Sequence, residues 1–371
     1  MNFDYSDDEK QLKRILRDLL MSESDIRSVR RVLDGPAYYN GELWEALAKL
    51  GWLSVALPET YGGQGLGYIA LCSVAEELGR ALAAVPFGSS IFLAAEALLI
   101  AGSERQRASL VPALGNGKLV GTMALAEKPG PLSPNNIDAF FRHDQLSGIK
   151  IAVTDGMSAD VAIVAARDGD DIALFVVDLN APGIVRETVN SMDPTRPLAR
   201  LIFDKAPAEP LGDRRRADWS VLERVLDRSA VLFAFEQLGG ADAALEKARD
   251  YALTRQAFGK QIGAFQAVKH KLADIYIANE LARSNAYYAA WALEEDAAVL
   301  PLAAATARVG STEAFERAAR DLIQVHGGIA ITWEHDCHFY YRRSRHLTTV
   351  IGAPIQWRKR LVGQLANTNA A

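Results

Sequence analysis

Cysteine is nearly absent from this chain of 371 residues, which contains only Cys72 and Cys337. Two thiols so far apart in the sequence cannot build a disulfide-stabilised scaffold, and they match no spacing that is typical of cysteine-rich zinc sites. We therefore expect both thiols to be reduced, as in a cytoplasmic protein, and we expect no metal site.

Long hydrophobic runs and export signals are also lacking. The longest apolar stretches fall short of the roughly 18 to 20 residues that a membrane span requires. The N-terminal sequence, MNFDYSDDEKQLKRIL, is acidic and has neither the basic start nor the apolar middle of a signal peptide. These absences predict a cytoplasmic protein that does not interact with membranes.

An excess of positive charge is missing as well, because the formal net charge is −5 and the pI is near 5.8. This balance disfavours nucleic acid as a partner. It still permits a local basic patch, formed by Arg342, Arg343, Arg345, Arg358, Lys359 and Arg360. These six side chains are either solvated cations on helix faces or ligands for phosphate groups.

The residues that are present favour a large core, since 49% of them are hydrophobic. Near the N-terminus, apolar residues with helical spacing predict a helix whose core-facing residues are Leu12, Ile15, Leu16 and Leu19. Helical patterns continue through about Leu114, apart from a glycine-rich break at residues 58–65. They return from about Arg216, where a turn with two glycines at 258–263 separates two further apolar stripes.

The middle of the chain has a different period. Short β-branched runs, separated by Asp-Gly clusters, predict an antiparallel meander or small barrel with strands near Gly148–Val153, Val161–Ala166, Ile172–Leu179 and Leu201–Asp204. The order of helices, strands and helices predicts an α+β protein with segregated parts. We expect an N-terminal helical domain at 1–116, a middle β domain at 117–213 and a C-terminal helical bundle at 214–371.

Five sequence elements, in order, resemble those of the acyl-CoA dehydrogenase family. They are PETYGG at 58–63, GSERQ at 102–106 with the residues that follow to Gly117, the end of the β region at 203–212, RQAFGKQIGAFQ at 255–266 and QVHGG at 324–328. The similarity covers nearly the whole chain. It implies the family's fold, with a C-terminal four-helix bundle, and FAD as the cofactor.

In this family the last two elements contact the FAD of a neighbouring subunit. The resemblance therefore implies that the cofactor-binding residues include Arg255, Phe258, Gln266, Gln324, Gly327 and Gly328. A planar guanidinium suits the flavin pyrophosphate, and glycine lets backbone approach a cofactor closely. On structural grounds alone, Phe258 would be a core aromatic residue and the glycines would cap a helix.

The positions that hold a subunit's own flavin differ from the family pattern. Residues 126–132 read AEKPGPL where the family has Thr-Glu-Pro-Gly-Ala-Gly-Ser, so a hydroxyl is lost and prolines replace two N–H donors. Ala152 replaces the family's flanking tryptophan, whereas Thr154 is kept and is expected to bind the flavin. This side of the site is the weaker match.

The catalytic carboxylate is missing from both places where the family carries it. Ile351 precedes Gly352 where the family has the Glu that removes the α-proton of the thioester. The alternate position corresponds to Ser229, which is no base for this proton. Glu236, seven residues further along the same predicted helix, is a weak candidate for a relocated base, and a structural ion pair is its simpler role.

Three hypotheses remain open at this point. The chain resembles bacterial family members acting on sterol or other bulky acyl-CoA substrates, several of which are heterotetramers in which one subunit type lacks the Glu. By that likeness it is the non-base subunit, acting with a paralogous subunit and with an electron-transferring flavoprotein that reoxidises FAD. Alternatively, identical subunits form a self-sufficient homotetramer that uses Glu236. The third hypothesis is a CoA-ligand-binding module or flavin-dependent oxygenase on the same scaffold.

Overall fold

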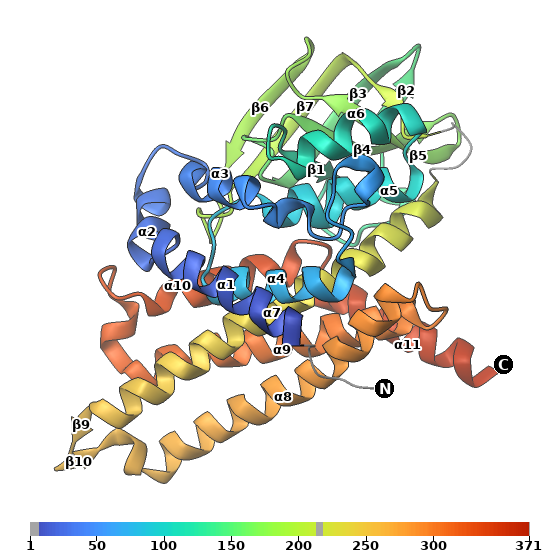
Figure 1. Ribbon diagram of the computed structural model, residues 1–371. Coiled ribbons are helices and arrows are strands. Elements are labelled where there is room, and N and C mark those ends of the chain that lie inside the picture. Colours follow the sequence, from blue (N-terminus) through green and yellow to red (C-terminus); the bar gives the residue numbers. More distant parts are fainter. Residues whose placement is uncertain (1–6, 213–217, 371) are drawn as a thin grey trace. The chain divides into compact units, whose positions relative to one another are not determined.

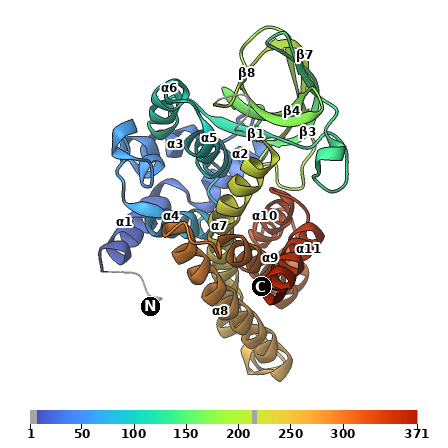
Figure 2. The same ribbon diagram turned by 90° about the vertical axis from the view of Figure 1, so that its right-hand side faces the viewer.

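The computed structural model describes residues 7–212 and 218–370. The chain forms two compact units (Figures 1 and 2). The helical unit comprises Met1–Val29, Tyr68–Ala83 and Ala230–Ala371, and the sheet unit comprises Arg30–Gly67 and Ala84–Ser229. The expected division at 116 and 213 stays a prediction. The second of these boundaries and the expected helix start near Arg216 lie outside the described residues.

Most of the longer helices among the described residues lie wholly or partly in the helical unit. They are α1 (Asp7–Glu23), α4 (Gly67–Arg80), α7 (Trp219–Thr254), α8 (Gln266–Glu294), α9 (Leu300–His326), α10 (Cys337–Thr349) and α11 (Pro354–Ala370). α7 begins in the sheet unit and continues into the helical unit. α8 and α9 pack along each other, and a short hairpin of β9 (Gln256–Ala257) and β10 (Lys260–Gln261) joins α7 to α8 (Figure 1).

Two glycines bring the backbones of α4 and α7 into direct contact. A Cβ atom at Gly79 would lie 1.9 Å from the carbonyl oxygen of Glu236, and one at Gly239 would lie 1.8 Å from that of Glu76. Glycine inside a helix costs roughly 0.5 to 1 kcal/mol relative to alanine. Here the missing side chains let the two helices approach more closely than any other residue would allow.

The sheet unit contains most of the remaining helices and one eight-stranded sheet. Its helices include α2 (Ile26–Asp34, which starts in the helical unit), α3 (Gly41–Lys49), the π-helix Gly88–Ala95, α5 (Glu96–Ala101) and α6 (Glu104–Gly115). Its strands are β1 (Gly121–Ala124), β2 (Phe140–Arg142), β3 (Gln145–Thr154), β4 (Val161–Asp168), β5 (Asp171–Asp178), β6 (Ile184–Val189), β7 (Leu198–Pro207) and β8 (Glu209–Pro210).

The sheet is mostly antiparallel, in the order β6-β7-β3-β2-β4-β5-β8. β1 is added in parallel beside β4, and β2 also meets β4 in parallel through a single residue pair. β4 and β5 are buried along most of their length, and Gly169, with φ of +68°, begins the two-residue turn that joins them. The α+β plan and the order of its parts are thus confirmed, with a mixed sheet in place of a purely antiparallel one.

One feature of the sequence prediction changes in detail. Ile15, expected to face the core, is 53% exposed, and the fully buried residues of α1 are Leu16 and Leu20. The stripe therefore lies about one residue further round the helix than predicted.

Among the described residues, no helix is both long and apolar enough to cross a membrane.

Candidate functional site

The hairpin after α7 presents its residues to solvent. Phe258 is 95% exposed and has a left-handed backbone, with φ of +52°, and Gly259 follows with φ of +77°. An exposed aromatic residue in this strained conformation is unusual, because non-glycine residues rarely adopt positive φ. Arg255 is also exposed, and its side chain has no hydrogen-bond or ion-pair partner among residues 7–212 and 218–370. The alternative interpretation of Phe258 as a core aromatic residue is therefore wrong, and both side chains are exposed.

The end of α9 is exposed in the same way. Gln324 is exposed, and Gly327 ends the helix with φ of +70°. A Cβ atom built at Gly327 or Gly328 would meet nothing within 4 Å. Open space at these glycines leaves their backbone approachable by a ligand, so no packing constraint within this chain explains why glycine occurs there.

These two elements lie at the same end of the helical unit. The ring of Tyr251, one turn before Arg255, stacks on His326 with ring centroids 4.0 Å apart. Lys271, in the second turn of α8 after Gln266, pairs with Asp321 on α9, with Nζ and Oδ1 3.1 Å apart. The chain thus brings together the hairpin side chains and the glycine turn that the sequence placed in one site.

The sheet unit contains Thr154, the expected flavin ligand on the other side of the site. β3 bulges against β7 between Lys150 and Val153, and Ala152 within the bulge has φ of +51°. Thr154 is buried, and its carbonyl oxygen accepts a 2.7 Å hydrogen bond from the hydroxyl of Thr122. Its backbone is therefore held within the sheet.

The loop that starts at Ala126 is closed by its own glutamate. The carboxylate of Glu127 accepts hydrogen bonds from the backbone N–H groups of Asp138, at 2.7 Å, and Ala139, at 3.1 Å. It also accepts a 2.6 Å hydrogen bond from Nζ of Lys150. Burial of this ammonium group lowers the pKa of Lys150. Charge-assisted bonds of this kind are strong, so Glu127 fixes the base of the loop while residues 128–131 remain exposed.

Neither expected base position holds an available carboxylate. Ile351 is buried, and its backbone carbonyl accepts a 3.2 Å hydrogen bond from Nε1 of Trp357. Ser229 is fully buried, and its hydroxyl is hydrogen-bonded to the carbonyl oxygens of Phe92 at 2.5 Å and Val225 at 2.7 Å. Both residues therefore have structural roles.

Glu236 lies in the core of the helical unit, where it pairs with a buried arginine. Its Oε1 is 3.7 Å from Nη1 of Arg343, and both side chains are almost fully buried. Arg343 also donates hydrogen bonds to the carbonyl oxygens of Leu82 and Ala83, each at 3.2 Å. The arrangement is that of a buried structural ion pair, which is the simpler of the two roles expected for Glu236.

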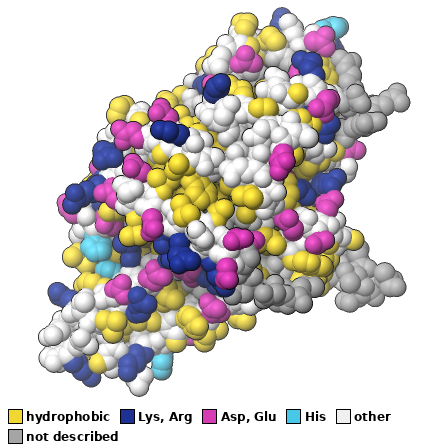
Figure 3. Space-filling view, in the orientation of Figure 1, with side chains coloured by type: hydrophobic (Ala, Val, Ile, Leu, Met, Phe, Trp, Pro, Cys, Tyr) yellow, Lys and Arg dark blue, Asp and Glu magenta, His cyan; other side chains and the backbone are white. Residues whose placement is uncertain are grey.

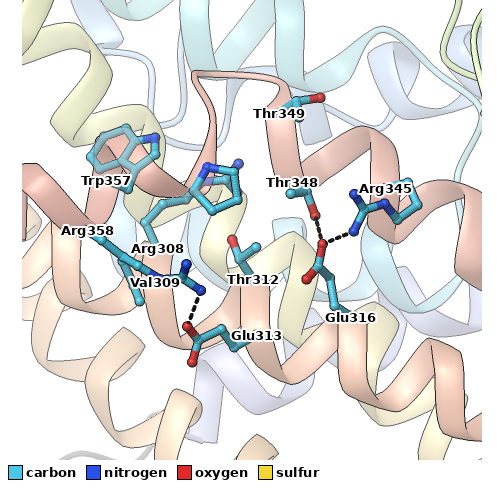
Figure 4. A pocket seen from close by; sticks show the side chains of 11 residues that line it. Arg308, Val309, Thr312, Glu313, Glu316, Arg345, Thr348, Thr349, Trp357 and Arg358 are labelled. Carbon is cyan, nitrogen blue, oxygen red and sulfur yellow. Dashed lines mark hydrogen bonds and ion pairs between the residues drawn. The ribbon is translucent and has the colours of Figure 1, made fainter. Parts of the chain in front are cut away.

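A cavity of about 250 Å³ lies between α9, α10 and α11 and is lined by charged side chains (Figure 4). Glu313 pairs with Arg358 at 2.7 Å, and Glu316 accepts hydrogen bonds from Arg345 and from the hydroxyl of Thr348. Burial lowers the pKa of Arg308 to about 9, while Glu236 raises it. Because both lining carboxylates are paired with arginines, this cavity offers no ready general base.

The predicted basic patch does not act as one surface. Arg343 is buried, whereas Arg345 and Arg358 are paired with Glu316 and Glu313. On the face shown in Figure 3, basic and acidic side chains are interspersed. One further group was missed by the sequence analysis: His326, His335 and Cys337 lie close together, although their spacing matches no common metal motif. The pair His335 and Cys337, two residues apart, was the available signal.

Comparison with known proteins identifies relatives of this chain. Residues 6–118 match the acyl-CoA dehydrogenase N-terminal domain, and residues 219–354 match the acyl-CoA dehydrogenase C-terminal domain. In sequence the chain is similar to acyl-CoA dehydrogenase IpdE2 of Mycobacterium tuberculosis, at 30% identity over 97% of this chain and 98% of the relative.

Two solved structures are similar in both sequence and fold. The ChsE4–ChsE5 complex from Mycobacterium tuberculosis matches with a TM-score of 0.89 and 28% identity, over 99% of each chain. A variant of the Tcur3481–Tcur3483 steroid ACAD matches with a TM-score of 0.89 and 31% identity, over 98% of this chain and 99% of that one.

Proposed function

The chain belongs to the acyl-CoA dehydrogenase family, whose members depend on FAD, and from that premise we propose that it is the non-base subunit of a heteromeric acyl-CoA dehydrogenase. In this role it contributes contacts to the flavin of a paralogous partner, and the partner supplies the carboxylate. The complex removes the α-proton and the β-hydride of an acyl-CoA thioester to form an α,β-double bond.

The observation that carries this proposal is the state of the two base positions. Ile351 cannot accept a proton, and the hydroxyl of Ser229 is hydrogen-bonded to two backbone carbonyls. Glu236 is paired with Arg343 in the core. General-base catalysis contributes about 10² to 10⁴ in rate, so a family member without this group needs it from elsewhere.

The exposed end of the helical unit fits an FAD that another subunit holds. Arg255 has a free planar fork for pyrophosphate oxygens, Phe258 offers an exposed ring, and the turn at Gly327 and Gly328 has open space in front of its backbone. When bound, FAD supplies the hydride acceptor of the reaction. The residues of this chain then hold and orient it, Gln266 and Gln324 by their amides.

The substrate that we propose is the CoA thioester of a bulky acyl group such as a steroid side chain. The likeness to the steroid ACAD supports this class, and the likeness to the ChsE4–ChsE5 complex supports an assembly of two different subunits. An electron-transferring flavoprotein is the proposed acceptor for the electrons of the reduced cofactor. A cytoplasmic location is part of the proposal, and the two free, buried cysteines are consistent with a reducing compartment.

The test compares the purified chain alone with the chain co-expressed with a paralogous subunit. We expect the complex to retain FAD and its flavin absorbance to bleach with a steroid acyl-CoA, whereas the chain alone turns over at least about 10²-fold more slowly. A matched control, Ile351→Val, keeps a buried branched side chain and should leave turnover by the complex unchanged. Bleaching of FAD by an acyl-CoA in the chain alone would contradict the proposal.

The self-sufficient homotetramer differs from this proposal in one outcome. It requires that the chain alone be active and that Glu236→Gln abolish turnover while FAD stays bound. Acyl-CoA binding by either preparation without any flavin reduction would instead favour the binding-module hypothesis.

A further inference from the structure

Three potential metal ligands meet where α9 ends and α10 begins. His326 is the last residue of α9, His335 lies in the connection, and Cys337 is the first residue of α10. One ligand atom from each side chain lies within 4.8 Å of the other two. We propose that these three side chains form a binding site for a divalent cation of the zinc class.

The orientation of His326 is already that of a metal ligand. Its Nδ1 is 2.9 Å from the carbonyl oxygen of Leu322, so this nitrogen donates its hydrogen and the lone pair lies on Nε2. Metal-bound histidines typically donate their other N–H in this way. The stacked ring of Tyr251 holds the imidazole in place, and burial lowers its pKa, which keeps it neutral.

His335 and Cys337 are held side by side at the start of α10. The backbone N–H of Cys337 donates to Nδ1 of His335 at 3.3 Å, and the rings of His335 and His326 meet edge to face at 5.0 Å. This hydrogen bond uses the Nδ1 lone pair, so His335 must give it up before either ring nitrogen binds a cation. Cys337 is 1% exposed, and burial raises the pKa of its thiol to about 12, so the unliganded side chain is protonated.

Binding of the cation would replace this proton. The thiol proton leaves to solvent as the metal–sulfur bond forms, because only the thiolate is a ligand. The fixed partners are then two imidazoles and one thiolate.

This ligand set indicates which cation fits. Imidazole and thiolate together favour zinc over magnesium or calcium, which prefer oxygen ligands. Three protein ligands leave the fourth tetrahedral position to water. Zinc bonds of about 2.0 to 2.3 Å require ligand atoms roughly 3.3 to 3.8 Å apart, so the group must contract by about 1 Å.

A bound cation would close the segment 327–336 into a metal-clamped loop. That segment begins with Gly327 and Gly328 and carries the exposed side chains of Ile329, Ile331 and Trp333. The clamp would therefore fix the turn next to His326. The proposal stands on the three ligands alone and does not depend on the proposed role of the chain in catalysis.

The test is a titration of the full, metal-free chain with Co²⁺, which replaces zinc in such sites and absorbs light. We expect one equivalent to bind, with visible d–d bands and a near-ultraviolet thiolate-to-cobalt charge-transfer band that zinc abolishes. Cys337→Ser should remove the charge-transfer band, and His326→Gln should weaken binding at least about tenfold. Cys72→Ser is the matched control, because Cys72 is the other buried thiol, and it should bind as wild type does.

Two results would overturn the proposal. One is a wild-type chain that takes up no Co²⁺ and retains no zinc after dialysis, an outcome that does not depend on how the variants fold. The other is a charge-transfer band that survives Cys337→Ser in protein whose far-ultraviolet circular dichroism is unchanged.

Discussion

The exposed end of the helical unit and the bulged strand of the sheet unit both carry residues that the sequence resemblance assigned to flavin binding, and the two regions differ in how these residues are bonded. At the helical end, the side chains of Arg255 and Phe258 are exposed, and the only hydrogen bond, ion pair or ring contact of either within the described residues is the edge-to-face contact of Phe258 with Phe265, at 6.2 Å between ring centroids. In the sheet unit, the Glu127 carboxylate and the Thr154 backbone are bonded to neighbouring residues.

This difference separates exposed side chains with few partners among the described residues from positions that are bonded within the fold. A strained and exposed aromatic residue contributes little to folding, so its occurrence needs a reason outside the chain. For a buried residue, its hydrogen bonds and ion pairs within the fold are enough to explain why that residue occurs there. The comparison teaches that Glu236 and Ser229 belong with the second group, although sequence position alone suggested chemistry for both.

Replacing Glu236 should give the largest effect, and on stability alone. Glu236→Gln leaves Arg343 buried with a neutral partner, and breaking a buried pair costs about 3 to 5 kcal/mol. Urea unfolding would measure this loss against Glu313→Gln, which breaks an exposed pair worth less than about 1 kcal/mol. Abolished turnover at unchanged stability and FAD content would instead make Glu236 a catalytic base.

Removing Arg255 should weaken the contact with the flavin. In the heteromeric complex, Arg255→Ala should cost about 2 kcal/mol or more in FAD affinity, roughly thirtyfold, because it leaves phosphate charge without its partner. Fluorescence of released FAD measures the effect, with Arg249→Ala, on the last turns of α7 before Arg255, as a control. Arg249 pairs with its neighbour Asp250, and its loss should change nothing. Equal effects of the two variants would remove Arg255 from the cofactor site.

Phe258→Gly should have opposite effects on the chain and on the complex. Relief of a left-handed phenylalanine should stabilise the isolated chain by up to about 1 kcal/mol, whereas loss of the exposed ring should reduce FAD retention in the complex. Thermal unfolding and flavin content report the two effects. Leu253→Ala, on an exposed leucine of α7, should change neither. A destabilised isolated chain would show that Phe258 serves the fold.

Thr154→Val should give the smallest effect and tests the other half of the comparison. If the sheet unit does not hold FAD through this hydroxyl, flavin content of the complex should be unchanged. Thr122→Val is the contrasting variant, because its buried hydroxyl donates to the Thr154 carbonyl and its loss should cost about 1 to 3 kcal/mol of stability. Loss of FAD from the Thr154 variant would indicate that this chain holds a flavin of its own.

Short β-branched runs bounded by turn residues predicted the strands well, as for those that became β4 and β5, which are buried along most of their length. The predicted apolar stripe failed at Ile15, which is exposed. Several apolar residues are neighbours on this short helix, so their spacing alone does not decide which of two adjacent faces is buried. The parallel pairing of β1 with β4 joins residues about 40 apart, which local pattern cannot indicate.

The candidate site was predictable only as far as motifs reach. The sequence elements indicated Arg255 and Gly327, but the partner of Glu236 lies more than 100 residues away at Arg343. The loop between α9 and α10 brings His326 and Cys337 together. The spacing of residues in the sequence does not determine the path of that loop. Bonds between distant residues decide which side chains are free to act, and these bonds need the folded chain.

The contact between α4 and α7 has a consequence for how this chain can vary. Every missense change at the codons for Gly79 and Gly239 introduces a Cβ atom, which would lie within 1.9 Å of a backbone oxygen of the opposite helix. No single substitution at either position can therefore be neutral, and a second change elsewhere cannot restore the fit without separating the helices. Glycine is therefore required at these two positions, whereas the rest of the helical unit is free to diverge in sequence.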